Sequence, residues 1–534
     1  FEEWARKAEA DARAKGRTLI IDRWSAHVIQ NLILANDSSG GLRHYFFSVT
    51  TFSDQWFADH IAAAKLAAGP RYNREISLET PLSGWFSSFS GGLDWQAQIA
   101  AHLEACCKET NHVEGFIEKK SGDPALPGWA EAAYEKGKKV VADSRNCVQS
   151  AEALAGAPTE EGLTKLQNCI DRLRVHLAAL DGDLAADLDA KHGTGSANSK
   201  RLRSFMAEYQ LSFPAANLDA VRDAQGKWRA FSDWLSSPTG FLAFRQVFVL
   251  SGSGGAGKTH SLCDIAQRRL GDGAYTCVVF GHQFGGEPDP WTRFAESLGV
   301  PLTLGRDGVL DTLEAAAECS GKKLVICVDA VNETRPRSYW LVRFAEFARA
   351  VASRADLKLC VSCRTSFLPA CLPKNFADQA VEHRGFAGME REACNAFFSH
   401  YNLEPPLVPV LQPELANPLY LKLVCETLRA KGLKQLPKGW FVIAPVIQAV
   451  LGHKEDQFAT EHSVSPGAAI VSGALRAISA AIAKAGSTAL RWSEAQSAID
   501  MAKPQAKGVN VLQWLVTADL LIEEGPSTDG IGAE

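Results

Sequence analysis

The sequence has no excess of positive charge and no long apolar run, and both absences narrow the range of functions. Its formal net charge is −5 over 534 residues, so no global positive field favours nucleic acid or an anionic membrane as a partner. No stretch reaches the roughly 18 apolar residues that are needed to span a bilayer, and no signal peptide is recognisable. We therefore expect a cytoplasmic protein without membrane contacts.

The sequence also lacks a cysteine framework, because its thirteen cysteines are odd in number and scattered. Several lie in apolar runs, including Cys277, Cys327 and Cys425, which is typical of buried thiols in a reducing compartment. Cys360 and Cys363 have CxxC spacing, but the run around them has the character of a buried strand. This pattern favours packing over a metal or redox site.

No internal repeat of fixed period occurs, and 534 residues are too many for one hydrophobic core. Changes in pattern predict six parts: an α+β fragment (1–68), a connector (69–89), a helical domain (90–240), an α/β core (241–384), a helical lid (385–440) and a winged-helix-like domain (441–534). The chain opens on Phe1 and ends at Glu534 soon after a strand-like run. We therefore expect both ends, and with them the last domain, to be truncated.

Hydrophobic periodicity distinguishes the helical domain from the α/β core. Apolar residues recur at intervals of three and four at Leu163, Leu166, Ile170, Leu173 and Leu177, which predicts a buried helix face. In the core, strand-like runs alternate with helical stretches, which predicts a parallel sheet with helices on both faces. These runs lie at 247–251, 276–280, 323–328 and 358–362.

The first fragment is predicted to contain strands and one helix. Strand-like runs lie at 18–21 and 44–49, and a helical pattern extends from about residue 54 to residue 68. Gly69 and Pro70 break that helix, and the segment 71–81 has an extended character.

The first strand of the core leads into a glycine-rich loop, GSGGAGKT, which satisfies GxxxxGK[ST]. Glycines let consecutive backbone N–H groups turn inward at a helix N-terminus and form an anion nest. Lys258 adds a compact charge for the β- and γ-phosphates, and the hydroxyl of Thr259 can bind Mg²⁺. A glycine-rich turn without a ligand is disfavoured by the strand before it and the helix after it. The residues predicted to hold the nucleotide are Gly252, Ser253, Gly254, Gly255, Ala256, Gly257, Lys258, Thr259 and His260.

A second buried run ends in a carboxylate, as a magnesium site beside a phosphate loop requires. Asp329 follows the run 323–328 and can hold the metal shell from the strand end. Glu333 can orient and deprotonate an attacking water. We predict Asp329, Asn332 and Glu333 as catalytic residues, and Thr259 with Asp329 as metal ligands. The alternatives are a solvated strand-end acid for Asp329 and a helix-terminal acid favoured by the helix dipole for Glu333.

Two further observations concern the nucleotide. Arg364 follows the strand-like run LCVSC, where a guanidinium can contact the γ-phosphate in bidentate fashion; a structural ion pair is the alternative. No [NT]KxD occurs, which removes the usual guanine-reading element and favours adenine. The predicted cofactors are ATP, with ADP as its product, and Mg²⁺.

Three features together resemble the STAND class of P-loop NTPases, whose members include the NACHT and NB-ARC signalling ATPases. They are the pattern DAxNE at Asp329–Glu333, Arg364 at the end of the next strand, and Asn417-Pro418 at the start of a helix. The resemblance implies an α/β P-loop NTPase fold of the STAND or AAA-like type, in which Pro418 packs against the adenine. Asn332 stands where the family has the first of two acids, which implies slow hydrolysis.

Within this class the sequence is most similar to the bacterial antiviral STAND proteins, the Avs group, from about Asp54 to its end. The similarity lies in the connector, which begins Gly69-Pro-Arg-Tyr72, and in the run from His383 to Tyr401. It implies an N-terminal effector, often a nuclease, whose last part is 1–68, and a C-terminal repeat domain that senses a phage protein. It also implies ATP-dependent assembly into a homo-oligomer, with a tetramer as one form. Nucleic acid would be contacted only through the effector.

Two parts of such a protein are not recognisable in the sequence. Residues 1–53 contain no complete nuclease set, and no C-terminal repeat array is present. Glu118-Lys119-Lys120 imitates part of an ExK motif, but it falls in the helical domain, where a solvated charge run is favoured.

The connector offers two further candidates for the nucleotide site. It can place Tyr72 on the adenine face and Arg71 near a phosphate. Equally, Tyr72 can serve as a packing aromatic between domains and Arg71 as a surface charge, and the sequence does not separate these interpretations.

The leading hypothesis for function is a signalling switch in antiviral defence. In it, ATP closes the core against the lid and the winged-helix-like domain and exposes surfaces that assemble into an oligomer, and slow hydrolysis resets the protein. The alternative is an AAA-type motor with continuous turnover, which would offer Arg335 or Arg337 to a neighbouring subunit's site. A scaffold with a vestigial site is disfavoured, because Lys258, Thr259 and Asp329 are intact.

Overall fold

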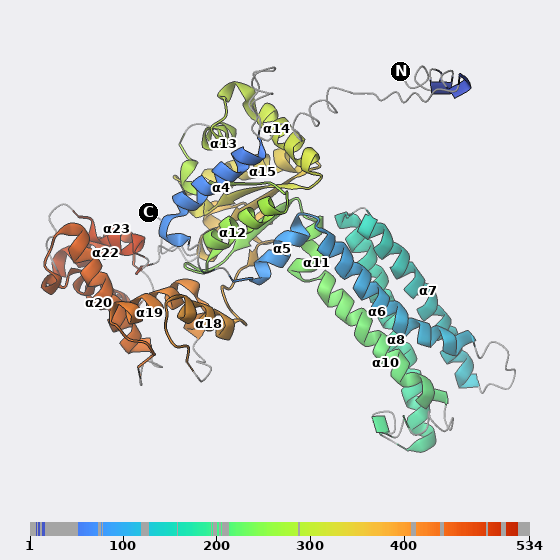
Figure 1. Ribbon diagram of the computed structural model, residues 1–534. Helices are drawn as coiled ribbons and strands as arrows, with labels where there is room; N and C mark the ends of the chain where they lie inside the picture. The colour runs from blue at the N-terminus through green and yellow to red at the C-terminus, as the bar shows by residue number, and fades with distance from the viewer. Residues whose placement is uncertain are drawn as a thin grey trace. The chain divides into compact units, whose positions relative to one another are not determined.

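The computed structural model describes residues 52–72, 76, 78–118, 128–156, 158–193, 213–286, 289–406, 413–437, 443–486, 490–502 and 509–518, with a few single residues elsewhere (Figure 1). The strands predicted at 18–21 and 44–49 lie outside these residues. Internal contacts divide the chain into two compact units, one formed by Pro81–Gln246 and one by the rest. None of the helices described is long and apolar enough to cross a bilayer.

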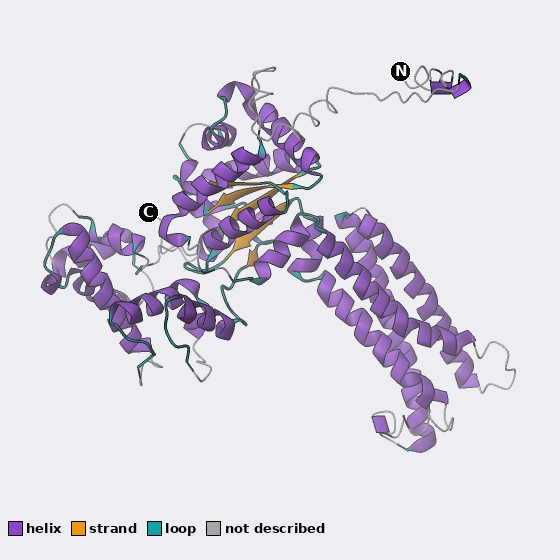
Figure 2. Ribbon diagram, in the orientation of Figure 1, coloured by secondary structure: helices purple, strands orange, loops and turns teal. Residues whose placement is uncertain are grey.

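The unit Pro81–Gln246 is a bundle of helices (Figure 2). Its long helices are α6 (Leu93–Glu118), α7 (Gly128–Gly156), α8 (Glu160–His192) and α10 (Phe213–Leu235), and its short ones are α5 (Pro81–Phe89) and α11 (Pro238–Phe241). In α8 the side chains of Leu166, Ile170, Leu173 and Leu177 are fully buried, and Leu163 packs beside them. The predicted helix face is therefore confirmed.

The extended character predicted for the connector ends at Pro81, and the second half of the connector is helical. Residues Pro81–Phe89 form helix α5, which buries Leu82, Phe86 and Phe89. Proline is favoured in the first turn of a helix, because the N–H that it lacks would have no partner there. Pro81 therefore begins a helix instead of ending an extended segment.

The α/β core contains a parallel sheet, as predicted. Its strands among the described residues are β1 (Val247–Ser251), β2 (Thr276–Phe280), β3 (Leu324–Asp329), β4 (Leu357–Ser362) and β5 (Val381–Glu382). They lie in the order β2-β3-β4-β1-β5, and every pairing is parallel. Because parallel strands end at the same edge, the loops that follow β1, β2, β3 and β4 meet there.

Helices cover both faces of this sheet (Figure 1). Helix α12 (Lys258–Gly271) packs on one face, and α13 (Pro290–Leu298), α14 (Gly305–Ser320) and α15 (Tyr339–Ala352) pack on the other. On this second face, strand residues such as Val279 and Ile326 meet Phe294, Leu313 and Phe344 in one hydrophobic cluster. The predicted arrangement of helices on both faces is confirmed.

Helix α4 (Asp54–Ala68) lies along the edge strand β2 and agrees with the helix predicted there. The imidazole of His60 accepts a hydrogen bond from the backbone N–H of Val278 (3.0 Å), and Phe57 stacks on Tyr275 with ring centroids 4.1 Å apart. Burial lowers the pKa of His60 to about 4, so the neutral ring can accept this bond at neutral pH. An unpaired strand edge is a template for unwanted pairing, and α4 covers it.

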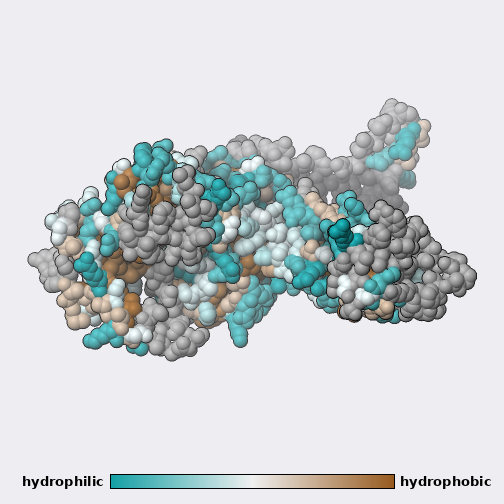
Figure 3. All heavy atoms as spheres, turned by 90° about the horizontal axis from the view of Figure 1, so that it is seen from below, coloured by the Kyte–Doolittle hydropathy of each residue, from teal (hydrophilic) through white to brown (hydrophobic). Residues whose placement is uncertain are grey.

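Two helical groups follow the sheet. Helices α18 (Glu390–His400) and α19 (Pro418–Ala430) share a hydrophobic cluster with Ile76 of the connector and with Phe386. The last group consists of α20 (Ile443–His462), α21 (Ile470–Ala485), α22 (Trp492–Ala502) and α23 (Val511–Thr517). Its described residues contain no strand, and the winged-helix form of 441–534 stays a prediction. On the face drawn in Figure 3, hydrophobic residues lie in small groups among hydrophilic ones.

Candidate nucleotide-binding site

The loop between β1 and α12 has the backbone of an anion nest. Gly255 and Gly257 have φ angles of 75° and 89°, a region that is strained for residues with a Cβ. Helix α12 begins at Lys258 without a side-chain cap, so no capping side chain occupies its first backbone N–H groups. Such groups, together with the positive end of the helix dipole, bind phosphate. Gly252 is required for space, because a Cβ there would lie 2.6 Å from the carbonyl oxygen of His383.

The ammonium group of Lys258 is folded back on the loop. It donates to the carbonyl oxygens of Gly252 (2.7 Å) and Ser253 (3.0 Å). Burial lowers the pKa of Lys258 to about 8, while the nearby charges of Asp329 and Arg364 act in opposite senses. Hydrogen bonds between two charged groups are stronger than those to neutral carbonyls. An anion that entered the loop would therefore be a better partner for Lys258 than the carbonyl oxygens are.

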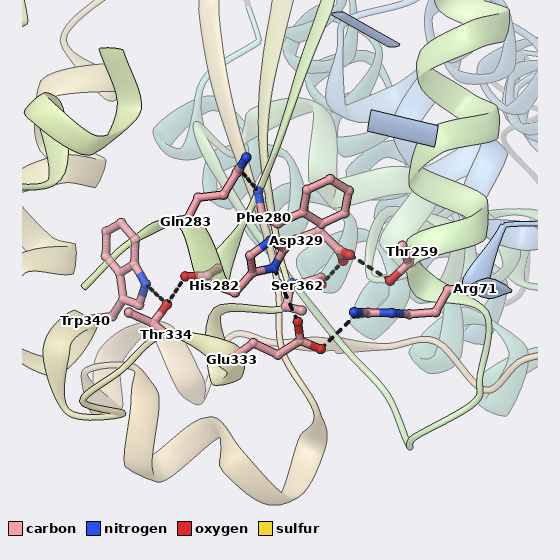
Figure 4. Close-up of polar contacts among 12 residues, drawn as sticks. Arg71, Thr259, Phe280, His282, Gln283, Asp329, Glu333, Thr334, Trp340 and Ser362 are labelled. Atoms are coloured by element: carbon pink, nitrogen blue, oxygen red, sulfur yellow. Dashed lines mark hydrogen bonds and ion pairs between the residues drawn. The ribbon is translucent and has the colours of Figure 1, made fainter. Parts of the chain in front are cut away.

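Thr259 and Asp329 meet at the carboxyl edge of the sheet (Figure 4). The Thr259 hydroxyl donates to one carboxylate oxygen of Asp329 (2.7 Å), and the Ser362 hydroxyl donates to the other. Asp329 is only 1% exposed, and Ser362 accepts a hydrogen bond from the backbone N–H of Ala330 (2.8 Å). This network holds the Asp329 carboxylate in one orientation.

The side chains of Thr259 and Asp329 fit a magnesium ion. Mg²⁺ takes oxygen ligands, usually one or two carboxylates completed by water and phosphate, and a hydroxyl beside a carboxylate offers such a donor pair. Among the residues that the structure describes, no group of three or more His, Cys, Asp or Glu side chains could hold a metal alone. A metal shared between these side chains and a phosphate agrees with this arrangement.

Asn332 and Arg364 are tied together at the ends of β3 and β4. The side-chain oxygen of Asn332 accepts a hydrogen bond from the backbone N–H of Arg364 (3.1 Å), and Asn332 is 7% exposed. Both residues line the pocket described below. Because an amide is not a base, we assign Asn332 to positioning the Arg364 turn rather than to proton transfer.

Glu333 ends the short turn η6 (Val331–Glu333), where two basic side chains meet it (Figure 4). Arg71 donates from Nη1 to Oε1 (2.9 Å), and Nδ1 of His282 lies 3.7 Å from Oε2. Burial acts to raise the pKa of Glu333, but the neighbouring His282 and Arg71 outweigh it, so the pKa lies below its ordinary value. The carboxylate is therefore ionised at neutral pH.

The N-terminus of α19 contacts the glycine-rich loop between β1 and α12 directly. Asn417 caps this helix by accepting from the backbone N–H of Leu419 (3.0 Å), and its amide donates to the carbonyl oxygen of Gly254 (3.2 Å). The N–H of Leu419 also donates to the carbonyl oxygen of Gly255 (3.3 Å). A Cβ at Gly255 would lie 2.8 Å from the Cβ of Leu419. The predicted Pro418 is thus held close against the loop.

The two connector candidates have different positions. Arg71 lines the pocket, whereas Tyr72 is not among the lining residues. Tyr72 instead stacks on the ring of His260 with centroids 5.2 Å apart, and the ammonium of Lys65 lies 5.2 Å from the Tyr72 ring. His260 offers a flat neutral partner, since burial lowers its pKa. Tyr72 therefore packs on His260, which lines the pocket, and is not itself part of the lining.

One pocket, with a volume of about 160 Å³, connects these groups. Its polar lining includes residues of the loop 254–261 together with Arg71, Thr80, Asp329, Asn332, Glu333, Ser362, Arg364, His383 and Lys422. Its larger apolar lining residues are Ile76, Leu78, Phe386, Phe397, Pro418 and Leu419, and all of these but Pro418 share one hydrophobic cluster. This division suits a ligand with a charged end and a flat, less polar end.

Several residues at this site are not predicted from the sequence. They include His282, Ser362, His383, Phe386, Phe397 and Lys422. Ser362 ends β4, one of the predicted strand-like runs, so its position at a strand end is the signal that could have identified it. His383 follows β5, which is only two residues long and gives no such signal. The lid residues follow no spacing rule that relates them to the phosphate loop.

Comparison with known proteins adds little to this description. No family model matches the chain, and no curated protein matches it. Among solved structures, the chain is similar to Cdc6p from Pyrobaculum aerophilum, with 12% sequence identity over 54% of this chain and 84% of that chain, and with a TM-score of 0.25. A score this low supports no argument about function, so the interpretation depends on the geometry of the site.

Proposed function

We propose that this chain is an ATP-binding switch of the P-loop NTPase type that hydrolyses ATP slowly. The main observation that supports this proposal is that the lid bonds directly to the phosphate loop. Hydrogen bonds run from Asn417 to Gly254 and from Leu419 to Gly255. A ligand in the loop changes the energy of this docking. By linkage, the position of the lid then changes the affinity for the ligand by the same factor. Such coupling is what a nucleotide switch requires.

The residues of the site divide the chemistry among them. Lys258 and the backbone N–H groups of the nest hold the β- and γ-phosphates. Thr259 and Asp329 hold Mg²⁺, which, when bound, neutralises phosphate charge. Arg364 contacts the γ-phosphate, and Glu333 orients the attacking water and accepts its proton. The adenine occupies the apolar side of the pocket, against Pro418.

Antiviral defence is the setting that we propose for this switch. The proposal derives from the sequence resemblance to the Avs group alone. In it, a phage protein is the activator, a homo-oligomer is the active form, and 1–68 belong to the effector that assembly turns on.

We expect the purified chain to turn over ATP at less than about 0.01 s⁻¹ and to remain monomeric with MgATP until its activator is added. This rate is that of signalling GTPases, whereas most enzymes exceed about 1 s⁻¹. Phosphate release and sedimentation velocity measure the two properties on the same sample. Fast multiple turnover without any partner would contradict the switch and favour a motor.

The motor alternative needs an arginine that reaches a neighbouring subunit. The guanidinium of Arg337 instead lies over the ring of Phe367 in its own chain, 4.8 Å from the centroid. Arg335 pairs through its backbone with Gly285. The Arg337 contact counts against a motor that depends on its guanidinium, whereas a backbone pairing does not fix where the Arg335 side chain lies.

Raising the pH from 7 to 9 is expected to weaken MgATP binding by about tenfold. Lys258 has a pKa of about 8, and a bound triphosphate raises it, so the protonated lysine is the form that binds. Affinity is therefore highest below pH 8 and falls as the lysine loses its proton above it. The second pKa of a phosphate is about 6, so the charge of the ligand changes little in this range. Calorimetry at pH 7, 8 and 9 tests this, and a flat profile would contradict it.

A further inference from the structure

The turn that carries Glu333 is fixed by buried contacts. The hydroxyl of Thr334 donates to the carbonyl oxygen of Gly281 (2.7 Å) and accepts from the indole N–H of Trp340 (2.9 Å) (Figure 4). A Cβ at Gly281 would lie 2.1 Å from the carbonyl oxygen of Ala330, so the turns after β2 and β3 touch backbone to backbone. The main chain at Glu333 therefore has little freedom to move.

His282 approaches Glu333 from the same rigid pair of turns. It lies in η4 (Gly281–Gln283), which is closed by a hydrogen bond from the backbone N–H of Phe280 to the side-chain oxygen of Gln283 (2.7 Å). Its ring stacks on Phe280 with centroids 5.6 Å apart. His282 and Glu333 thus keep their relative position when other parts of the chain move.

Arg71 approaches from a different part of the chain, in the turn Gly69–Arg71 directly after α4. The N–H of Gly69 caps α4 by donating to the carbonyl oxygen of Leu66, with a φ of 55° that favours glycine. The side chains of Arg71 and Glu333 are 43% and 26% exposed. A half-exposed ion pair adds little to stability, so this contact can open without unfolding the core.

We propose that Arg71 restrains Glu333, and that α4 sets this restraint, so that the segment before the core controls ATP hydrolysis. The inference rests on the proposed ATPase function. The bond from Arg71 takes up one acceptor site of Oε1 and fixes the orientation of the carboxylate, so a water must compete with Arg71 for Glu333. The ion pair and His282 also hold the pKa of Glu333 low, and a carboxylate of low pKa takes a proton less readily. When Arg71 turns toward the phosphates, Glu333 is released.

The test is the steady-state kcat of Arg71→Ala at saturating MgATP. We expect a rise of about fivefold, which corresponds to about 1 kcal/mol and is the scale of an exposed ion pair. Arg71→Lys should give a smaller rise, because a lysine keeps the charge but loses the planar fork of donors. Arg306→Ala is the matched control. Arg306 is 44% exposed and pairs with Asp307 (3.0 Å) on α14, so its replacement should leave kcat unchanged.

A double variant identifies the target of Arg71. In the Glu333→Gln background, Arg71→Ala should produce no acceleration, because the restrained carboxylate is gone. Acceleration that persists there would overturn the inference, as would an unchanged or lower kcat for Arg71→Ala in a chain that binds MgATP; in both cases the proposed function would stand. If the wild-type chain bound no MgATP in calorimetry, the proposed function would fail and the inference with it.

Discussion

Lys258→Ala is expected to lower the affinity for MgATP by about 100-fold at pH 7, where Lys258 is protonated. A hydrogen bond to a charged group contributes up to about 3 kcal/mol, which corresponds to a factor of about 100. The ammonium of Lys258 has only the carbonyl oxygens of Gly252 and Ser253 as hydrogen-bond partners in the loop. The ammonium can exchange these carbonyl oxygens for phosphate oxygens without breaking an ion pair, so most of the free energy of the new hydrogen bonds contributes to binding. Calorimetry with MgATP measures the loss.

Lys374→Ala is the control for this prediction. Lys374 is an exposed lysine of α17 (Lys374–Ala377) and does not line the pocket. Its replacement changes the net charge equally and should leave the affinity unchanged. If Lys258→Ala bound MgATP as tightly as the wild type, with an unaltered circular dichroism spectrum, phosphate would not enter this loop and the assignment would be wrong.

The phosphate loop could be predicted from the sequence because one continuous stretch determines both its shape and its chemistry. Positive φ at Gly255 and Gly257 needs glycine, and the residues that follow begin the helix. The pairing of Thr259 with Asp329 could also be predicted, since parallel strands end at one edge of a sheet. The first step requires no knowledge of distant packing, and the second requires only that β1 and β3 belong to one parallel sheet.

The surroundings of Glu333 could not be predicted, because they depend on packing between elements that are distant in sequence. His282 reaches Glu333 only because β2 lies beside β3 in a register that places Phe280 opposite Asp329. Arg71 reaches it only because α4 runs along β2. From the sequence alone, Arg71 and Tyr72 each have two possible interpretations. The two residues are neighbours in the chain, but only Arg71 lines the pocket. Strand β5 has two residues, too few for any periodicity.

Glu333→Gln is expected to lower kcat by about 10²- to 10⁴-fold, the usual contribution of a general base, while MgATP affinity changes by less than about twofold. The only carboxylates among the residues that line the pocket are Asp329 and Glu333. Both oxygens of Asp329 already accept hydrogen bonds from Thr259 and Ser362. Asn332 beside it is an amide. The imidazoles of His260 and His383 also line the pocket, but burial lowers the pKa of both, that of His383 to about 4, so they are weak bases in place of Glu333.

In this variant the rate of hydrolysis should fall while the affinity for MgATP stays nearly the same. The reason is that Glu333 bonds to Arg71 and lies near His282, and neither residue belongs to the loop that holds the phosphates. Single-turnover hydrolysis and calorimetry on the same preparation measure the two properties. Glu296→Gln, which removes an exposed carboxylate paired with Arg293 (2.8 Å), is the matched control and should change neither. A Glu333→Gln protein that hydrolyses ATP at the wild-type rate would remove Glu333 from the chemistry. It would also leave the contact with Arg71 without a catalytic target, since the restraint can act on turnover only through a carboxylate that turnover needs.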